Sequence, residues 1–273
     1  MSGRAGQRGL VEAVGAALIS AVCYLGGMTL LLGQTLRWIV RGLAGRKTRL
    51  GGEALAAQCV RVGVRSVGIV SLVQIFIGVI LALQMTPPLK PWGQVDKIAN
   101  IIGVAGFRML GPIITAVVLS GFAGASIAAE LGAMVGAEEI KALEAMALNP
   151  VRYLVVPRVL ATVLMTVLLT IVADWMIAVG GYLASVVALG PDVYYGYWER
   201  MRTQLRLRDF LTGLVMAGVF GVLISIIACH EGLRVRGDAE SVGRATTMTV
   251  VYSIVGIIVA ACIFTVIFYV LKL

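Results

Sequence analysis

The chain has 273 residues, of which 59% are hydrophobic and only 14% are charged, and its mean hydropathy is +0.96. Soluble domains are about half apolar and about a quarter charged, so this composition excludes an ordinary soluble globular protein. The formal net charge of +9 at pH 7 fits contact with anionic lipid and gives no reason to expect nucleic acid as a partner.

Six segments of the sequence are long and apolar enough to cross a hydrocarbon core, which requires about 20 helical residues. They are continuously apolar, whereas the strands of a membrane barrel alternate between apolar and polar residues over about ten positions. We therefore expect an all-α integral membrane protein. The segments are 13–36, 66–89, 109–129, 159–191, 210–229 and 245–271.

The first segment is interpreted as a helix lying in the membrane interface, although a sixth span stays open. It is long, lacks a clear small-residue cleavage site and leads into basic residues between Arg37 and Arg49, which argues against a signal peptide. With five spans, 15 of the 23 Lys and Arg residues fall on the cytoplasmic side, against 13 with six. Basic residues mark the cytoplasmic side, so five spans are preferred, and both arrangements place 130–158 there.

The expected architecture is an N-terminal tail and interfacial helix over 1–60, followed by a five-span domain over 61–273. The loop 191–210 should hold a surface helix on the outer leaflet, because its tyrosines and tryptophan suit an interfacial belt; its four arginines would face headgroups, a partner or solvent. The spans are expected at about 64–86, 105–130, 158–188, 210–230 and 247–270, with a cytoplasmic helix at about 137–148.

That cytoplasmic helix interrupts the apolar sequence between the second and third spans. Ile140 and Leu143 fall on one face of it, and glutamates occupy its first turn, where the helix dipole favours negative charge. Asn149 and Pro150 are expected to end it, because the residue before a proline is pushed out of the α region.

The charge of this helix favours docking on a cytoplasmic partner over lying on the membrane. Its three glutamates against the single Lys141 would be repelled by anionic lipid. The residues expected to make the contact are Glu138, Glu139, Ile140, Leu143, Glu144, Met146, Asn149 and Pro150.

Two stretches, LGPIITAVVLSGFAGASIAAELGAMVGAEEIKALEAMALNPVRYLVVPRVLA and GLRVRGDAESVGRATTMTVVYSIV, resemble the MlaE/YrbE family of permeases from lipid-transporting ABC systems that work with MCE proteins. The resemblance covers nearly all of the chain from about residue 60 onward, with its pieces in the family's order. It implies five spans preceded by an interfacial (elbow) helix, and a coupling helix at 137–148 that sits on a separate cytoplasmic ABC ATPase. It also implies a second permease copy, a bacterial inner membrane, and phospholipid passing to a periplasmic MCE-domain protein.

The resemblance also implies a lipid cavity on the outer side, where the first span ends and the second begins. Pro87, Pro88 and Pro91 should end the first span, since proline cannot continue a helix. An ordinary extended loop is the alternative for this stretch. The residues placed on or near the lipid path are Leu83, Gln84, Thr86, Met109 and Leu110.

Two positions depart from the family's pattern. Phe122 stands in GFAG where the family often has Arg, and Met109 stands before LGP where it often has Glu. Any polar role of these positions is in doubt, and the apolar residues point to a different or more hydrophobic lipid.

Catalytic and cofactor sites are not expected in this chain. The stretch GLAGRKT at 42–48 breaks the Gly-Lys-Ser/Thr of a phosphate-binding loop at Arg46, so ATP and Mg²⁺ should be bound by a partner ATPase. Four scattered cysteines and one histidine give neither a metal site nor a disulfide framework.

Two carboxylates within apolar surroundings are candidate functional residues. Asp174 could form a structural hydrogen bond or ion pair, line the transport path or couple transport to protons. Glu130 is expected to pair with a nearby arginine in the coupling region. The preferred function is a non-catalytic permease subunit; the alternatives are an ion-coupled secondary transporter of a hydrophobic substrate that uses Asp174, and a membrane scaffold without transport.

Overall fold

The computed structural model describes residues 3–44, 52–236 and 238–271, and within these ranges every regular element is helical. Six helical runs are long and apolar enough to cross a membrane. This confirms the predicted all-α membrane class.

The runs follow one another in chain order. They are α1 (Gly3–Ala44); α2 (Gly52–Val62), η1 (Val64–Ser66) and α3 (Val67–Leu89); η3 (Val95–Lys97), α4 (Ile98–Ala105), η4 (Gly106–Leu110), α5 (Gly111–Leu119), η5 (Ser120–Gly124) and α6 (Ala125–Gly136); η6 (Val151–Val155), α8 (Val156–Ala184) and η7 (Ser185–Leu189); α11 (Leu207–Leu233); and α12 (Ala239–Val270). The second run also includes η2 (Lys90–Trp92) at its end. The short elements between the runs are α7 (Glu139–Ala145), α9 (Pro191–Tyr194) and α10 (Tyr197–Gln204).

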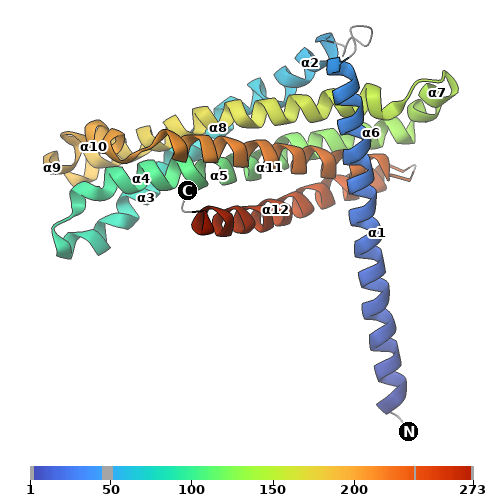
Figure 1. Ribbon diagram of the computed structural model, residues 1–273, viewed down its shortest axis with the longest axis horizontal. Helices are drawn as coiled ribbons and strands as arrows, with labels where there is room; N and C mark the ends of the chain where they lie inside the picture. The colour runs from blue at the N-terminus through green and yellow to red at the C-terminus, as the bar shows by residue number, and fades with distance from the viewer. Residues whose placement is uncertain (1–2, 45–51, 237, 272–273) are drawn as a thin grey trace.

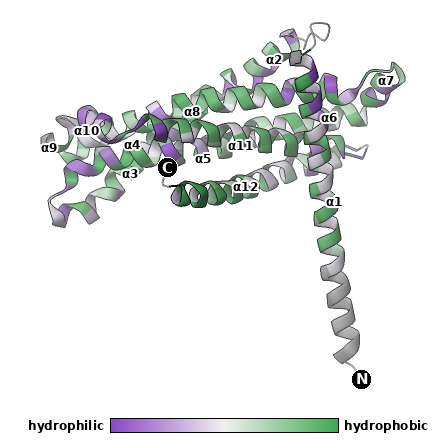
Figure 2. Ribbon diagram, in the orientation of Figure 1, coloured by the Kyte–Doolittle hydropathy of each residue, from purple (hydrophilic) through white to green (hydrophobic). Residues whose placement is uncertain are grey.

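Five of the runs lie side by side in a bundle, and α1 crosses that bundle steeply near the end that carries α7 (Figure 1). Only 6% of the span-length segment of α1 is buried, against 50% for those of α8 and α11. Hydrophilic residues gather toward the two ends of the bundle, around α10 and around α2, α6 and α7 (Figure 2). α1 thus differs from the other five runs in both direction and exposure.

The centre of the bundle is α8, which packs along α3 and α11. Close approach of α3 and α8 requires glycine on both helices. A Cβ on Gly78 would overlap the Ile177 carbonyl oxygen, and one on Gly180 would overlap the Ile75 carbonyl oxygen. Small residues that let backbones meet are the usual contact in membrane helix pairs, where apolar burial alone drives little association.

The predicted surface helix in the outer loop is present as α10. Its first residue, Tyr197, is buried, and the Tyr197 hydroxyl donates to the Ala178 carbonyl of α8 at 3.2 Å. The Tyr197 and Trp198 rings pack on Tyr182, with centroids 5.7 Å away in both cases. Aromatic packing therefore ties α10 to the C-terminal end of α8.

The helix end predicted from Pro87, Pro88 and Pro91 falls within that stretch, but after the first two prolines. α3 continues through Pro87 and Pro88 to Leu89, and its end is marked by η2 and by Gly93 in the left-handed region with φ 62°. Each proline removes one backbone donor, but both lie in the last turn, at the exposed end of the helix, where the freed carbonyls of Leu83 and Gln84 can meet solvent.

Candidate functional site

The cytoplasmic helix predicted at 137–148 is present but shorter, because α7 covers Glu139–Ala145. Glu138 before it and Ala147 after it both have φ 58°. Left-handed backbone at a non-glycine residue cannot propagate a helix. α7 is therefore a helix of two turns between sharp bends, projecting from one end of the bundle (Figure 1).

The prediction that Asn149 and Pro150 end this helix is wrong, because they begin the next one. The Asn149 side-chain oxygen accepts hydrogen bonds from the N–H groups of Val151, at 3.0 Å, and Arg152, at 3.3 Å. Asparagine is a favoured N-cap, and proline suits the first helical position, where no N–H is needed. The restraint that proline places on the preceding residue fits a helix start as well as a helix stop.

The residues expected to make the cytoplasmic contact are brought together at this end of the molecule. None of α7 is buried. Ile140 and Leu143 are half-buried, and Met146 is 61% exposed beside them. Lys141 lies 2.7 Å from Glu138, and this hydrogen-bonded contact lowers the pKa of the Glu138 carboxyl and raises that of Lys141. α7 presents a small apolar surface inside a charged rim.

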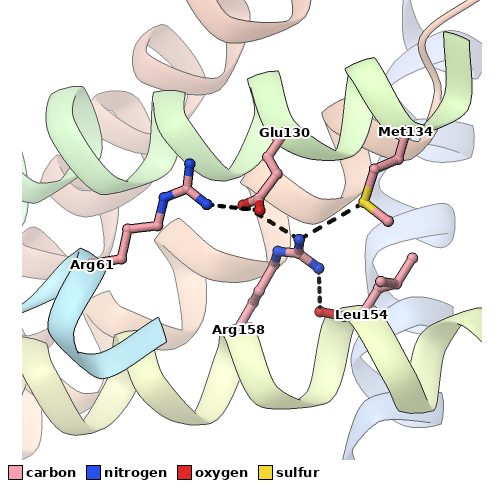
Figure 3. A network of polar contacts seen from close by, with 5 residues as sticks. All are labelled: Arg61, Glu130, Met134, Leu154 and Arg158. Carbon is pink, nitrogen blue, oxygen red and sulfur yellow. Dashed lines mark hydrogen bonds and ion pairs between the residues drawn. The ribbon is translucent and has the colours of Figure 1, made fainter. Parts of the chain in front are cut away.

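Toward the end of the bundle that carries α7, three helices contribute charged side chains to one network (Figure 3). The Glu130 carboxylate of α6 is 2.7 Å from the Arg61 guanidinium of α2 and 3.3 Å from that of Arg158 on α8. Arg158 also donates to the Leu154 carbonyl at 2.9 Å, and its second terminal nitrogen lies 4.0 Å from the Met134 sulfur. Glu130 thus has the arginine partner expected from the sequence, and a second one besides.

A small cavity of about 50 Å³ opens between η4, α11 and α12, away from α7. The Arg108 guanidinium on its wall lies 3.4 Å from the Asp209 carboxylate and 5.4 Å from the centre of the Phe268 ring. The cavity is lined by Arg108, Met109, Met216, Thr265 and Phe268. It combines a guanidinium with flexible apolar side chains.

The predicted lipid-path residues lie in different surroundings. Met109 lines the cavity, whereas Leu110 packs against an apolar cluster formed by α3, α4, η4, α8 and α10. Leu83 and Gln84 lie exposed at the end of α3, where Thr86 donates to the Ala82 carbonyl at 2.8 Å. Sequence reasoning missed Arg108, although a basic residue next to an apolar span is a signal for such a site.

Asp174 lies in the centre of the bundle with a side chain that is 1% exposed. Neither of its oxygens has a hydrogen-bond partner among the described residues. It contacts Gly111 of α5, where a Cβ would overlap its carboxylate. Gln74 of α3 donates to the Gly111 carbonyl at 3.2 Å and to the Thr115 hydroxyl at 3.1 Å. Asp174 and Gln74 therefore flank the same glycine where α3, α5 and α8 meet.

Comparison with known proteins finds one family over most of the chain. The family model for permease MlaE matches residues 55–267. A probable ABC transporter permease protein of Rickettsia felis is 35% identical over 212 residues, covering 78% of this chain and 82% of that protein.

Two further relatives carry more specific names. The intermembrane phospholipid transport system permease protein MlaE of Haemophilus influenzae is 32% identical over 192 residues, covering 70% of this chain and 73% of that protein. The chloroplastic protein TRIGALACTOSYLDIACYLGLYCEROL 1 of Arabidopsis thaliana is 33% identical over 208 residues, covering 74% of this chain and 58% of that protein.

Proposed function

This chain belongs to the MlaE permease family, and from that premise we propose that it is the membrane subunit of an ABC transporter that moves phospholipid between the bacterial inner membrane and a periplasmic MCE-domain protein. A separate cytoplasmic ATPase binds ATP and Mg²⁺, and this chain performs no catalysis of its own. The name of the Haemophilus influenzae relative supports phospholipid as the substrate.

The observation that carries the proposal is the placement of α7 at one end of the bundle, with no residue of it buried. An exposed helix with a small apolar centre and a charged rim suits docking into a groove on a partner protein. The partner ATPase would move α7, and α6 and α8, which flank it in the chain, would carry that movement into the bundle.

The direction and exposure of α1 support five spans behind an interfacial helix. If the five bundled runs cross the membrane, a helix that crosses them steeply lies close to the membrane plane (Figure 1). Its low burial fits contact with lipid along much of its length. This arrangement also places more basic residues on the cytoplasmic side.

The cavity beside Arg108 supports an anionic lipid headgroup as part of the cargo. A guanidinium pairs well with phosphate oxygens, and Met109, Met216 and Phe268 offer apolar contacts to acyl chains. Its volume of about 50 Å³ is far below the roughly 300 Å³ of a drug-sized site. The cavity must therefore widen, or be completed by a second permease copy, to hold a lipid.

The docking role of α7 is tested with Leu143→Glu, which places a charge at the apolar centre of α7. Co-purification of the ATPase and ATP-dependent phospholipid transfer from proteoliposomes should both be lost, while the chain remains in the membrane. Leu143→Met keeps an apolar side chain of similar volume and is the control, with both activities retained. Undiminished co-purification of the ATPase with Leu143→Glu would refute the docking role.

A second candidate, an ion-coupled secondary transporter, is supported by the deep burial of Asp174 without a hydrogen-bond partner among the described residues. It predicts lipid transfer driven by a proton gradient in vesicles that hold this chain alone. Transfer that needs both the ATPase and ATP would exclude it.

A further inference from the structure

The carboxylate of Glu130 is shared between two arginines that differ in burial. The side chain of Arg158 is only 6% exposed, whereas that of Arg61 is 43% exposed; Glu130 itself is 28% exposed. Figure 3 shows Glu130 reaching from α6 toward both of them. The two ion pairs share an anion but have different surroundings.

This difference decides which ion pair can break. A buried cation that loses its carboxylate cannot be solvated in exchange, so breaking such a pair is strongly unfavourable. An exposed arginine regains water when it leaves, and surface pairs contribute little to stability. Arg61 can therefore release Glu130 at low cost, whereas Arg158 cannot.

The network also joins helices whose main packing partners differ. α6 packs against α11 and α12, α2 packs against α8, and α8 also packs along α3 and α11. Glu130 joins α6 directly to α2 and α8. α7 joins α6 to α8 through the chain, because it lies between them.

The geometry leaves room for Glu130 to change its pairing. Its Oε2 atom already lies 3.3 Å from a terminal nitrogen of Arg158, although the two form no hydrogen bond, and the Nε atom of Arg158 is buried without a hydrogen-bond partner in the described structure. If Arg61 leaves, both carboxylate oxygens can turn toward the Arg158 guanidinium, which accepts a carboxylate side-on through two donors. Glu130 would then stay paired throughout.

From these observations we propose that the Glu130–Arg158 pair is a fixed pivot for α6, and that the Glu130–Arg61 pair is a latch that opens when α7 is moved. Both arginines are positioning residues. The pivot follows from burial alone, whereas the opening of the latch rests on the proposed docking of an ATPase on α7.

The pivot is tested by double-mutant cycles on the full-length permease in detergent, with the thermal unfolding midpoint as readout. Glu130→Gln should lower the midpoint by roughly 5–10 °C, because it strands Arg158 without a carboxylate. Adding Arg158→Gln should restore much of the loss, whereas adding Arg61→Gln should restore none. Equal coupling in the two cycles, or stronger coupling to Arg61, would overturn the pivot.

The latch is tested with Arg61→Gln in the complete transporter. The unfolding midpoint should stay within about 2 °C of the parent, whereas the amount of lipid transferred per ATP hydrolysed should fall severalfold. Arg61→Lys keeps the charge and should recover most of that ratio, which a purely structural role would not predict. An unchanged ratio in Arg61→Gln would overturn the latch.

The motion is measured with spin labels in a chain whose native cysteines have been replaced. The distance between labels at Val60 of α2 and Ala133 of α6 should shift when the complex is trapped with ATP. The distance from Ala133 to Leu164 of α8 should change less. If the distance from Val60 to Ala133 does not change in a transporter that still moves lipid, the latch alone is refuted. If the parent transporter shows no ATP-dependent lipid transfer, the proposed function is refuted, and the double-mutant cycles still test the pivot.

Discussion

At the scale of single residues, the bundle buries the carboxyl group of Asp174 almost completely and places that of Glu130 between two arginines. Asp174 has no hydrogen-bond partner among the described residues, whereas Glu130 has two arginines. An unpaired buried charge is costly, whereas a neutral group of the same shape costs much less. Replacing each carboxylate by its amide is therefore expected to have opposite effects on stability at the two positions.

Asp174→Asn should keep the unfolding midpoint of the permease unchanged or raise it by a few degrees, since it removes an ionisable group from a buried site without a partner. ATP-dependent phospholipid transfer should be retained. Both are measured on the purified complex by a thermal melt and a vesicle transfer assay. Loss of transfer with a normal melt would instead place Asp174 in the transport mechanism.

The buried hydroxyl of Tyr197 gives a pH dependence with a defined sign. Burial raises the pKa of Tyr197 above its usual value, so the folded protein keeps the phenol proton at pH values where the unfolded chain has lost it. The stability that this neutral phenol contributes is present below about pH 10 and is lost as the pH rises further.

Tyr197→Phe removes both the ionisable group and the hydrogen bond to the Ala178 carbonyl. It should cost about 1 kcal/mol at neutral pH, and its unfolding midpoint should fall less steeply than that of the parent between pH 9 and pH 11. Parallel curves for the two proteins over this range would contradict the assignment.

At the scale of elements, sequence reasoning located helices better than it located their ends. The apolar runs were predicted because length and apolar content are local properties of the chain, and α10 was predicted because its aromatic residues suit a membrane interface. The end of the first span was placed slightly too early, because proline is tolerated in the last turn of a helix at an exposed end. The role of Asn149 was misjudged, because asparagine followed by proline fits the start of a helix. Turn signals in a sequence indicate a helix boundary, but they do not show whether a residue ends one helix or begins the next.

The contact of α3 with α8 gives a prediction with a control on the same helix. Gly78→Ala places a methyl group against the Ile177 carbonyl and should lower the unfolding midpoint, whereas nothing lies within 4 Å of a Cβ at Gly68. Gly68→Ala should be neutral or slightly stabilising, because alanine has the higher helix propensity. Similar midpoints for the two variants would show that α3 and α8 do not pack this closely.

At the scale of the whole molecule, the sequence could not show which distant residues meet. The cavity draws its wall from η4, α11 and α12, and only Met109 among its residues had been singled out. Likewise, an arginine partner for Glu130 was expected, but the burial of Arg158 depends on α6 and α8 coming together. Such sites are properties of tertiary packing, for which one sequence holds no direct signal.

The five-span arrangement predicts that the N-terminus and α7 face the same side of the membrane. A cysteine at Ser2 and one at Glu144, each in a cysteine-replaced chain, should both react with a membrane-impermeant thiol reagent in inverted vesicles and be protected in right-side-out vesicles. Opposite reactivity of the two positions would indicate six spans.

The length of α1 has a consequence for the lipid around the protein. A helix of 42 residues is roughly 60 Å long, and in the five-span arrangement much of it would lie among the headgroups of the cytoplasmic leaflet. It would then take up area in one leaflet and none in the other. Each copy would act as a wedge that expands the cytoplasmic leaflet. The lateral pressure and the curvature of the bilayer would then influence where in the membrane the transporter accumulates.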